Sequence, residues 1–209
     1  DTTPGPKVTA LIVRGREGYA ATKIPFVKLR YAYQIVRLSQ YYGQYDQAIA
    51  DYRKYALPVL GASKEIGAWV TCNYAGCLRQ TKRYAASAYA FSRVYADSKS
   101  RRIQARWGWR IRNDAQWDQV MALCKNDQER ADNHALRALS MHAIPHADMR
   151  AMQQLDPGRE DLDLILVREI NKLEFDFFGA SGFGSTKFED RILRRDYARK
   201  AHERVATLD

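Results

Sequence analysis

Apolar side chains recur every three or four positions between residues 26 and 178, which is the spacing that gathers them on one face of an α-helix. Leu29, Tyr33 and Val36 follow this spacing in one segment, and Ile49 and Tyr52 follow it in the next. Glycine, proline and pairs of polar residues interrupt the pattern, so each helix should cover about 10–17 residues. No two segments show the alternation that paired strands require. The pattern therefore predicts an all-α fold.

Three segments of this region share one arrangement of residues. They are YDQAIADY from Tyr45, YAASAYAF from Tyr84 and WDQVMALC from Trp117. Each segment opens with an aromatic residue after a predicted turn. A small or apolar residue follows three positions later, and an apolar residue follows seven positions later (Ala48, Ser87 and Val120; Tyr52, Phe91 and Cys124). The starts lie 39 and then 33 residues apart, a period typical of stacked helix–turn–helix repeats.

On these residues the chain resembles the tetratricopeptide repeat (TPR), whose unit is a pair of antiparallel helices that approach closely at small residues. The best match is GQYDQAI, Gly43 to Ile49, which fits the turn and the start of the second helix. Ala75 and Gly108 fit the small position of the first helix in the next two units. Leu155-Asp156-Pro157 resembles the end of a fourth unit.

The chain also departs from the repeat at identifiable positions. Val36 stands where the first unit should have a small residue, and Lys82 stands where the second unit should have the turn glycine. Most of the tyrosines fit the repeat, since Tyr45 and Tyr52 fall on the inner stripe of the second helix. Tyr41 is not needed for that packing and is therefore expected to face another group.

The resemblance implies a TPR-like α-α solenoid, in which antiparallel helix pairs stack into a right-handed superhelix. The chain would then divide into four parts. These are an extended N-terminal lead-in (1–25), the helical repeat domain (26–178), a Gly-rich connector (179–187) and a C-terminal capping or next-repeat helix (188–209). Because the sequence starts at Asp1 rather than methionine, we expect it to be one segment of a longer protein.

Composition narrows the possible functions. The formal net charge of +10 favours anionic partners. Three cysteines without a CxxC pair argue against a disulfide framework or a zinc site. The longest apolar run has four residues, Leu164 to Val167, far short of the ~18 that a membrane span needs. Because no catalytic constellation is recognisable either, we expect no enzymatic activity, no cofactor and no metal.

The expected function is that of a non-enzymatic scaffold that binds a protein or peptide partner, including other parts of the same longer chain. Oligomeric state is not predicted. The chain also resembles long bacterial helical-repeat proteins of uncharacterised function, some of them exported. That resemblance implies an exported or periplasmic location, with the cytoplasm as the alternative.

In the TPR family one face of each first helix lines a concave groove that holds the partner. Carried onto this sequence, the resemblance implies a groove rich in arginine and aromatic residues, formed by Arg30, Tyr33, Arg37, Gln40, Tyr41, Trp69, Arg79, Gln80, Arg102, Trp109 and Arg112. Cys72, Gly76, Ala105 and Asn113 complete the three stripes. An acidic partner segment is the expected ligand, and a groove filled by the lead-in or the last helix is the alternative.

A second hypothesis is that the basic segment at residues 98–112 binds nucleic acid. Its candidate contacts are Lys99, Arg101, Arg102, Arg106 and Arg110, because arginine beside tryptophan can hold phosphates and stack on bases. Trp107 and Gly108 fall at packing positions of the repeat, so at least one tryptophan should be buried. A third hypothesis is that the chain is a non-catalytic segment of a larger enzyme.

Overall fold

The computed structural model describes residues 5–140 and 145–178, and of residues 173–178 the backbone alone. All regular elements in this part of the chain are helical, which confirms the all-α prediction. The expected connector (179–187) and last helix (188–209) lie outside the described residues. Two compact units divide the chain, residues 1–132 and 133–209, and each is described by itself.

The first unit contains seven α-helices, a π-helical turn and a 3₁₀ segment among its described residues, and α8 begins in it. In chain order these are α1 (Pro6–Ala21), α2 (Pro25–Tyr41), α3 (Tyr45–Asp51), η1 (π, Tyr52–Ala56), η2 (3₁₀, Leu57–Ala62), α4 (Lys64–Gln80), α5 (Tyr84–Asp97), α6 (Arg102–Gly108), α7 (Asp114–Leu123) and α8 (Asp127–Ala138).

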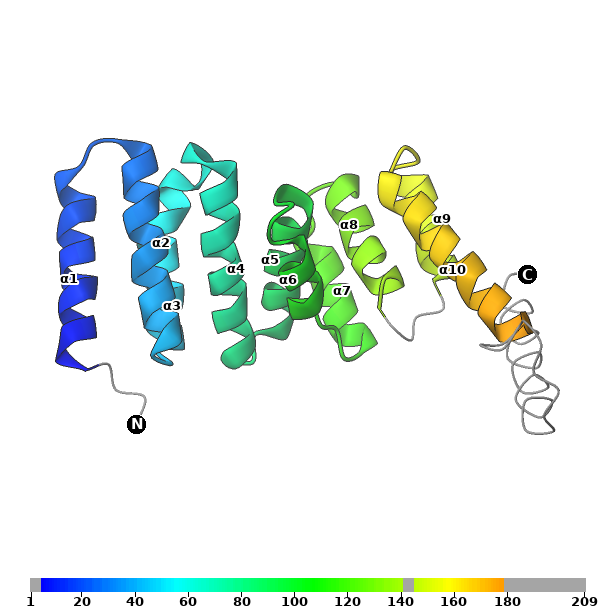
Figure 1. Cartoon of the computed structure of the whole chain (residues 1–209), viewed down its shortest axis with the longest axis horizontal. Helices are drawn as coiled ribbons and strands as arrows, with labels where there is room; N and C mark the ends of the chain where they lie inside the picture. Colours follow the sequence, from blue (N-terminus) through cyan, green and yellow to red (C-terminus); the bar gives the residue numbers. More distant parts are fainter. Residues whose placement is uncertain (1–4, 141–144, 179–209) are drawn as a thin grey trace. The chain divides into compact units, whose positions relative to one another are not determined.

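Neighbours in the chain are also neighbours in space within this unit. The main contacts join α1 with α2, α2 with α3 and α4, α4 with α5, and α5 with α6 and α7. Figure 1 shows that α1 and α2 run in opposite directions, as do α4 and α5, whereas α2 and α4 run in the same direction. Prolines at the first turns of α1 and α2 and an N-cap from Ser63 at α4 help set the helix starts.

Residues 39–44 and 78–83 form the same turn, 39 positions apart. In the first, the amide of Gln44 donates to Ser39 O at 2.9 Å and Gly43 has a φ of 71°. In the second, the amide of Arg83 donates to Leu78 O at 2.8 Å and Lys82 has a φ of 62°. Both close a helix with a left-handed residue in the manner of a Schellman motif, so lysine holds the place of the turn glycine.

The repeated small and apolar positions form the core of this unit. Ala48, Ser87 and Val120 are buried, as are Tyr52, Phe91 and Cys124. The small first-helix positions Ala75 and Gly108 are buried too. Close approach of α4 and α5 is marked by a hydrogen bond of 2.8 Å from the Ser87 hydroxyl to Ala75 O. The spacing of the sequence therefore located the packing stripe correctly.

The N-terminal segment corrects one expectation, because residues 6–21 are helical rather than extended. α1 packs on α2, where Gly15 meets Ile35 and Gly18 faces Tyr31. Its Arg16 pairs with the buried Asp51 of α3 at 3.0 Å. Glycines at positions 15 and 18 suggested a broken chain, but here they allow a neighbouring helix to approach.

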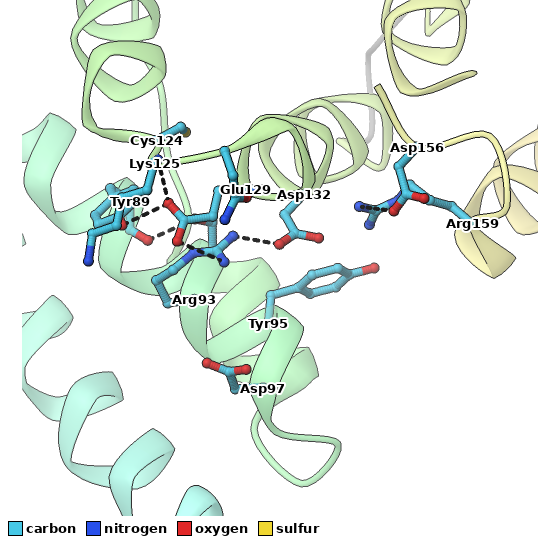
Figure 2. Close-up of polar contacts among 12 residues, drawn as sticks. Tyr89, Arg93, Tyr95, Asp97, Cys124, Lys125, Glu129, Asp132, Asp156 and Arg159 are labelled. Atoms are coloured by element: carbon cyan, nitrogen blue, oxygen red, sulfur yellow. Dashed lines mark hydrogen bonds and ion pairs between the residues drawn. The ribbon is translucent and has the colours of Figure 1, made fainter. Parts of the chain in front are cut away.

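The second unit continues from the end of α8 through α9 (His146–Leu155) and α10 (Glu160–Phe178). Asp148 of α9 accepts from His134 Nδ1 at 2.7 Å and from Arg137 Nε at 2.8 Å. On the loop before α10, Arg159 pairs with Asp161 at 2.7 Å and Asp156 at 3.8 Å; Figure 2 shows the latter pair.

Candidate functional site

Aromatic and arginine side chains gather on one face of the α2–α4 pair. The ring centres of Tyr33 on α2 and Trp69 on α4 lie 5.9 Å apart. Arg37, one turn after Tyr33, holds its guanidinium carbon 5.9 Å from the Tyr33 ring centre and 5.3 Å from that of Tyr41. Tyr41 is 72% exposed, as expected for a tyrosine that the repeat does not need. We call this surface the aromatic–arginine face.

Two further arginines border the same face. Arg30 lies 6.0 Å from the ring centre of Phe26, and Arg101 lies 5.3 Å from that of Trp69. Between α2 and α4 is a hollow of about 770 Å³. Its described lining contains no carboxylate and consists of Phe26, Val27, Arg30, Tyr31, Tyr33, Gln34, Arg37, Ile66 and Trp69. Guanidinium groups over aromatic rings and a lining without acids favour a negatively charged ligand.

Trp69 is held in place by hydrogen bonds around Glu65. The indole Nε1 donates to Glu65 Oε1 at 2.8 Å and also to Ser100 Oγ at 3.1 Å. Glu65 in turn accepts from the hydroxyls of Ser98 and Ser100 on the α5–α6 loop. These bonds, from Ser100 first and then from Trp69, lower the pKa of Glu65, so it stays a carboxylate at neutral pH and serves as an acceptor.

The remaining residues of the expected groove contact different helices. Arg79 donates to Gly108 O at 3.4 Å, and Arg102 Nε donates to Tyr95 O at 3.2 Å. The guanidinium of Arg112 lies 4.4 Å from the ring centre of Tyr84. Gln40 lies over Gly76, where an added methyl group would come within 2.8 Å of its Nε2. Gln80, also expected there, is exposed at the end of α4.

The third stripe of the expected groove is not formed. α6 ends at Gly108, and Trp109 follows with an extended backbone, so residues 102, 105, 109 and 112 do not share a helix face. Trp109 is only 5% exposed, whereas Trp107, placed by the repeat at a packing position, is 69% exposed. The structure thus confirms that one tryptophan is buried and corrects which one.

A buried charged cluster that sequence reasoning missed joins α5 to α8. Arg93 Nη2 donates to Asp132 Oδ2 at 2.5 Å, and its Nη1 lies 3.6 Å from Glu129 Oε1. Glu129 Oε2 accepts from the Tyr89 hydroxyl at 2.9 Å and from the Lys125 amide at 2.8 Å, as Figure 2 shows. Tyr89 and Arg93 stand four apart, as residues on one helix face do, but nothing in the sequence links them to acids about 40 residues later.

The cluster shifts two pKa values in opposite directions. Burial opposes ionisation of Glu129, but the Lys125 amide, the Tyr89 hydroxyl and the charge of Arg93 outweigh it, and its pKa lies below the ordinary value. Burial, reinforced by the bond to Glu129, raises the pKa of Tyr89 to about 12. At neutral pH Glu129 is therefore a carboxylate and Tyr89 a neutral donor.

Comparison with protein-family models, curated proteins and solved structures finds no match for this chain. None of the described helices has both the length and the apolar character that crossing a membrane demands. Within residues 5–140 and 145–178, no three His, Cys, Asp or Glu side chains gather as metal ligands would.

Proposed function

We propose that this chain is a TPR-like helical-repeat module that binds an acidic segment of a protein partner on its aromatic–arginine face. It would act by binding rather than by catalysis. The observation that carries the proposal is the Tyr33–Trp69 contact, which has Arg37 on one ring and Arg101 on the other. Tyrosine, tryptophan and arginine are the residues that dominate the energetics of protein interfaces.

The repeat part of the proposal is supported by the two turns that match at a separation of 39 residues. Chain neighbours pack on one another, and the buried small residues recur at the expected positions. A stack of such pairs with the handedness of the TPR family would give a right-handed superhelix. α2 and α4 would then be successive first helices, which is why their side chains meet on one face.

The cysteines favour a binding function over one that uses a reactive thiol. Cys72, Cys77 and Cys124 are all buried. Burial raises the pKa of Cys72 to about 11 and that of Cys77 to about 12. Because the thiolate is the nucleophile, neither of these two would react appreciably at neutral pH.

The test compares two fluorescein-labelled peptides of equal length by fluorescence polarisation. One carries Asp and Glu between leucines, and the other carries Asn and Gln at the same positions. We expect the acidic peptide to bind about tenfold more tightly or better, with an affinity that falls as salt rises. The double variant Arg30→Glu with Arg37→Glu should lose this preference.

The matched control is Lys7→Glu with Arg14→Glu on α1, which makes the same change in net charge on exposed residues outside the face. It should keep nearly all of the binding. Equal losses in both double variants would show attraction by net charge alone and would overturn the assignment to the aromatic–arginine face.

A second candidate function is single-stranded nucleic-acid binding at α6. It is favoured by Trp107, which is exposed beside Arg106 and one turn after the exposed Ile103. An exposed indole among arginines is a stacking platform for bases. Salt-sensitive binding of random single-stranded DNA that is lost in Trp107→Ala, but kept in the Arg30→Glu and Arg37→Glu variant, would establish this function.

A further inference from the structure

A second concave site lies within residues 1–132, away from the aromatic–arginine face. It is a groove of about 700 Å³ that α4 and α5 line together with η1, η2 and the segment between α7 and α8. Its volume is in the range of small-molecule sites in proteins, ~300–1,000 Å³. We call it the η2–α5 groove.

Small residues leave the groove open. Gly67 and Ala68 of α4 and Ala86 and Ala90 of α5 line it, so no long side chain from these positions fills the space. Two exposed leucines, Leu57 (54%) and Leu123 (42%), border it from outside the α4–α5 pair. Apolar surface that converges on one concave space is a common feature of ligand sites.

Residues of η1 and η2 form one wall of this space. After α3 the chain widens into a π-helical turn and then tightens into the 3₁₀ segment. η2 packs across the start of α4, where a methyl group on Gly67 would lie 2.8 Å from the Leu60 carbonyl oxygen. A π-helical turn is rare and is often found at functional sites.

The polar groups of the groove indicate what kind of ligand it would accept. The hydroxyls of Tyr52 and Tyr89 are engaged, since Tyr52 bonds to Thr71 Oγ1 at 3.0 Å and Tyr89 to Glu129. These tyrosines therefore offer ring surface rather than spare hydrogen bonds. A ligand body without hydrogen-bonding groups suits such walls, because a polar body would lose its water without gaining partners.

The charges of the groove favour a negative head group. Both of its acids are paired: Asp97 lies 3.8 Å from Lys64, and Glu129 belongs to the Arg93 cluster. Arg53 and Lys125 also line the groove. Within residues 5–140 and 145–178 neither side chain forms an ion pair, although the charge of Lys125 contributes to the lowered pKa of Glu129. Both cations can therefore face an anion in the groove.

We propose that the η2–α5 groove binds a small amphiphilic anion, with an aliphatic body along the alanines of α5 and an acidic head toward Arg53 and Lys125. The shared chemistry is an acyl or alkyl chain that ends in a carboxylate or a phosphate. This site is separate from the aromatic–arginine face, and the proposal does not depend on the proposed peptide binding.

The test is calorimetric titration of the full chain with four amphiphiles of one chain length, each below its micelle concentration. They are decanoate, decyl phosphate, decanol and decyltrimethylammonium. We expect the two anions to bind at least about tenfold more tightly than the alcohol and the cation. Decanoate stronger than decyl phosphate would indicate a carboxylate ligand, and the reverse order a phosphate ligand.

Two variants localise the binding. Ala86→Leu fills the groove, and Arg53→Glu with Lys125→Glu reverses its free charges; each should weaken anion binding about tenfold or more. The controls are Ala20→Leu on α1, which adds the same bulk, and Lys23→Glu in the loop after α1, which also reverses a positive charge. Both positions are exposed and outside the groove, so these variants should bind the anions normally. Circular dichroism checks that each variant is folded, and if Ala86→Leu is not, the charge variant decides.

Equal affinity for the anions and the cation would overturn the proposal. So would unchanged anion binding in the charge variant. Binding of the acidic peptide but of none of the four amphiphiles would also count against it, while leaving the proposed peptide function intact.

Discussion

Trp69 Nε1 and Glu65 Oε1 lie 2.8 Å apart, one helical turn from each other on α4, and this bond fixes the indole at the centre of the aromatic–arginine face. Glu65→Ala should loosen the indole, because its Nε1 then keeps only the longer hydrogen bond to Ser100 Oγ at 3.1 Å among the described residues. We expect the Nε1–H resonance of Trp69 to shift in ¹H–¹⁵N spectra and its hydrogen exchange to become faster. Glu65→Gln keeps an acceptor oxygen and should change both much less. An unchanged Trp69 resonance in Glu65→Ala would contradict the assigned role.

The two turns with a left-handed residue predict that substitutions at Lys82 and Gly43 change the stability in opposite directions. Lys82→Gly should stabilise the protein by about 0.5–1 kcal/mol, because a side chain at positive φ is strained. Gly43→Ala should destabilise it by about 1–2 kcal/mol for the same reason. Urea denaturation measures both, and equal signs for the two variants would contradict the shared turn.

Close approach at Gly108 predicts a large cost for a single methyl group. Gly108→Ala would place its Cβ 2.4 Å from the buried ring of Phe91, so we expect a loss of about 1–3 kcal/mol from overpacking. Gly61→Ala is the control, because no atom lies within 4 Å of its added Cβ; its effect should stay within about 0.5 kcal/mol. Similar melting temperatures for the two variants would argue against this packing.

Glu129 predicts a pH dependence of stability. Its pKa is lower in the folded chain than in the unfolded chain, so its stabilising effect is present above the ordinary value of 4.5 and is lost as the pH falls through the folded pKa. Urea denaturation between about pH 7 and about pH 3 should show this loss, and Glu129→Gln should flatten the corresponding slope. The variant should also be less stable at neutral pH, because Arg93 loses a charged partner. An unchanged slope would place the acid sensitivity elsewhere.

The three thiols should resist modification while the chain is folded. Ellman's reagent at neutral pH should react very slowly with Cys72, Cys77 and Cys124, because all are buried. In denaturing urea all three should react quickly. Fast reaction of one thiol under native conditions would identify a local opening, and single Cys→Ser variants would show where it is.

Sequence spacing predicted the packing of this chain better than its surface. Ala48 and Ser87 were placed correctly because three- and four-residue periodicity reports which side of a helix is buried. Trp107 and Trp109 were exchanged because the periodicity was extended through Gly108, where α6 ends. The helical lead-in was missed because Gly15 and Gly18 resemble breakers until the neighbouring helix is seen.

The candidate sites were predictable in part, for a related reason. Arg37 and Tyr41 stand four apart on one helix, so their common face follows from spacing alone. The contact between Tyr33 and Trp69 depends on how α2 and α4 pack, and it was anticipated only through the repeat. The charged cluster of Arg93 and the η2–α5 groove arise from contacts across 30 to 40 residues and from a π-helical turn, for which the sequence offers no local signal.

The neighbour-to-neighbour packing of residues 1–132 has a consequence for how this part of the chain folds. Its main contacts join elements that lie close in sequence, so few loops must close over long distances before contacts form, and folding should be fast. Loss of a terminal helix would remove the contacts of its immediate neighbour and leave the interior pairs in place. Unfolding of this region should therefore advance from its ends by degrees, with α1 exchanging its amide protons before the α4–α5 pair.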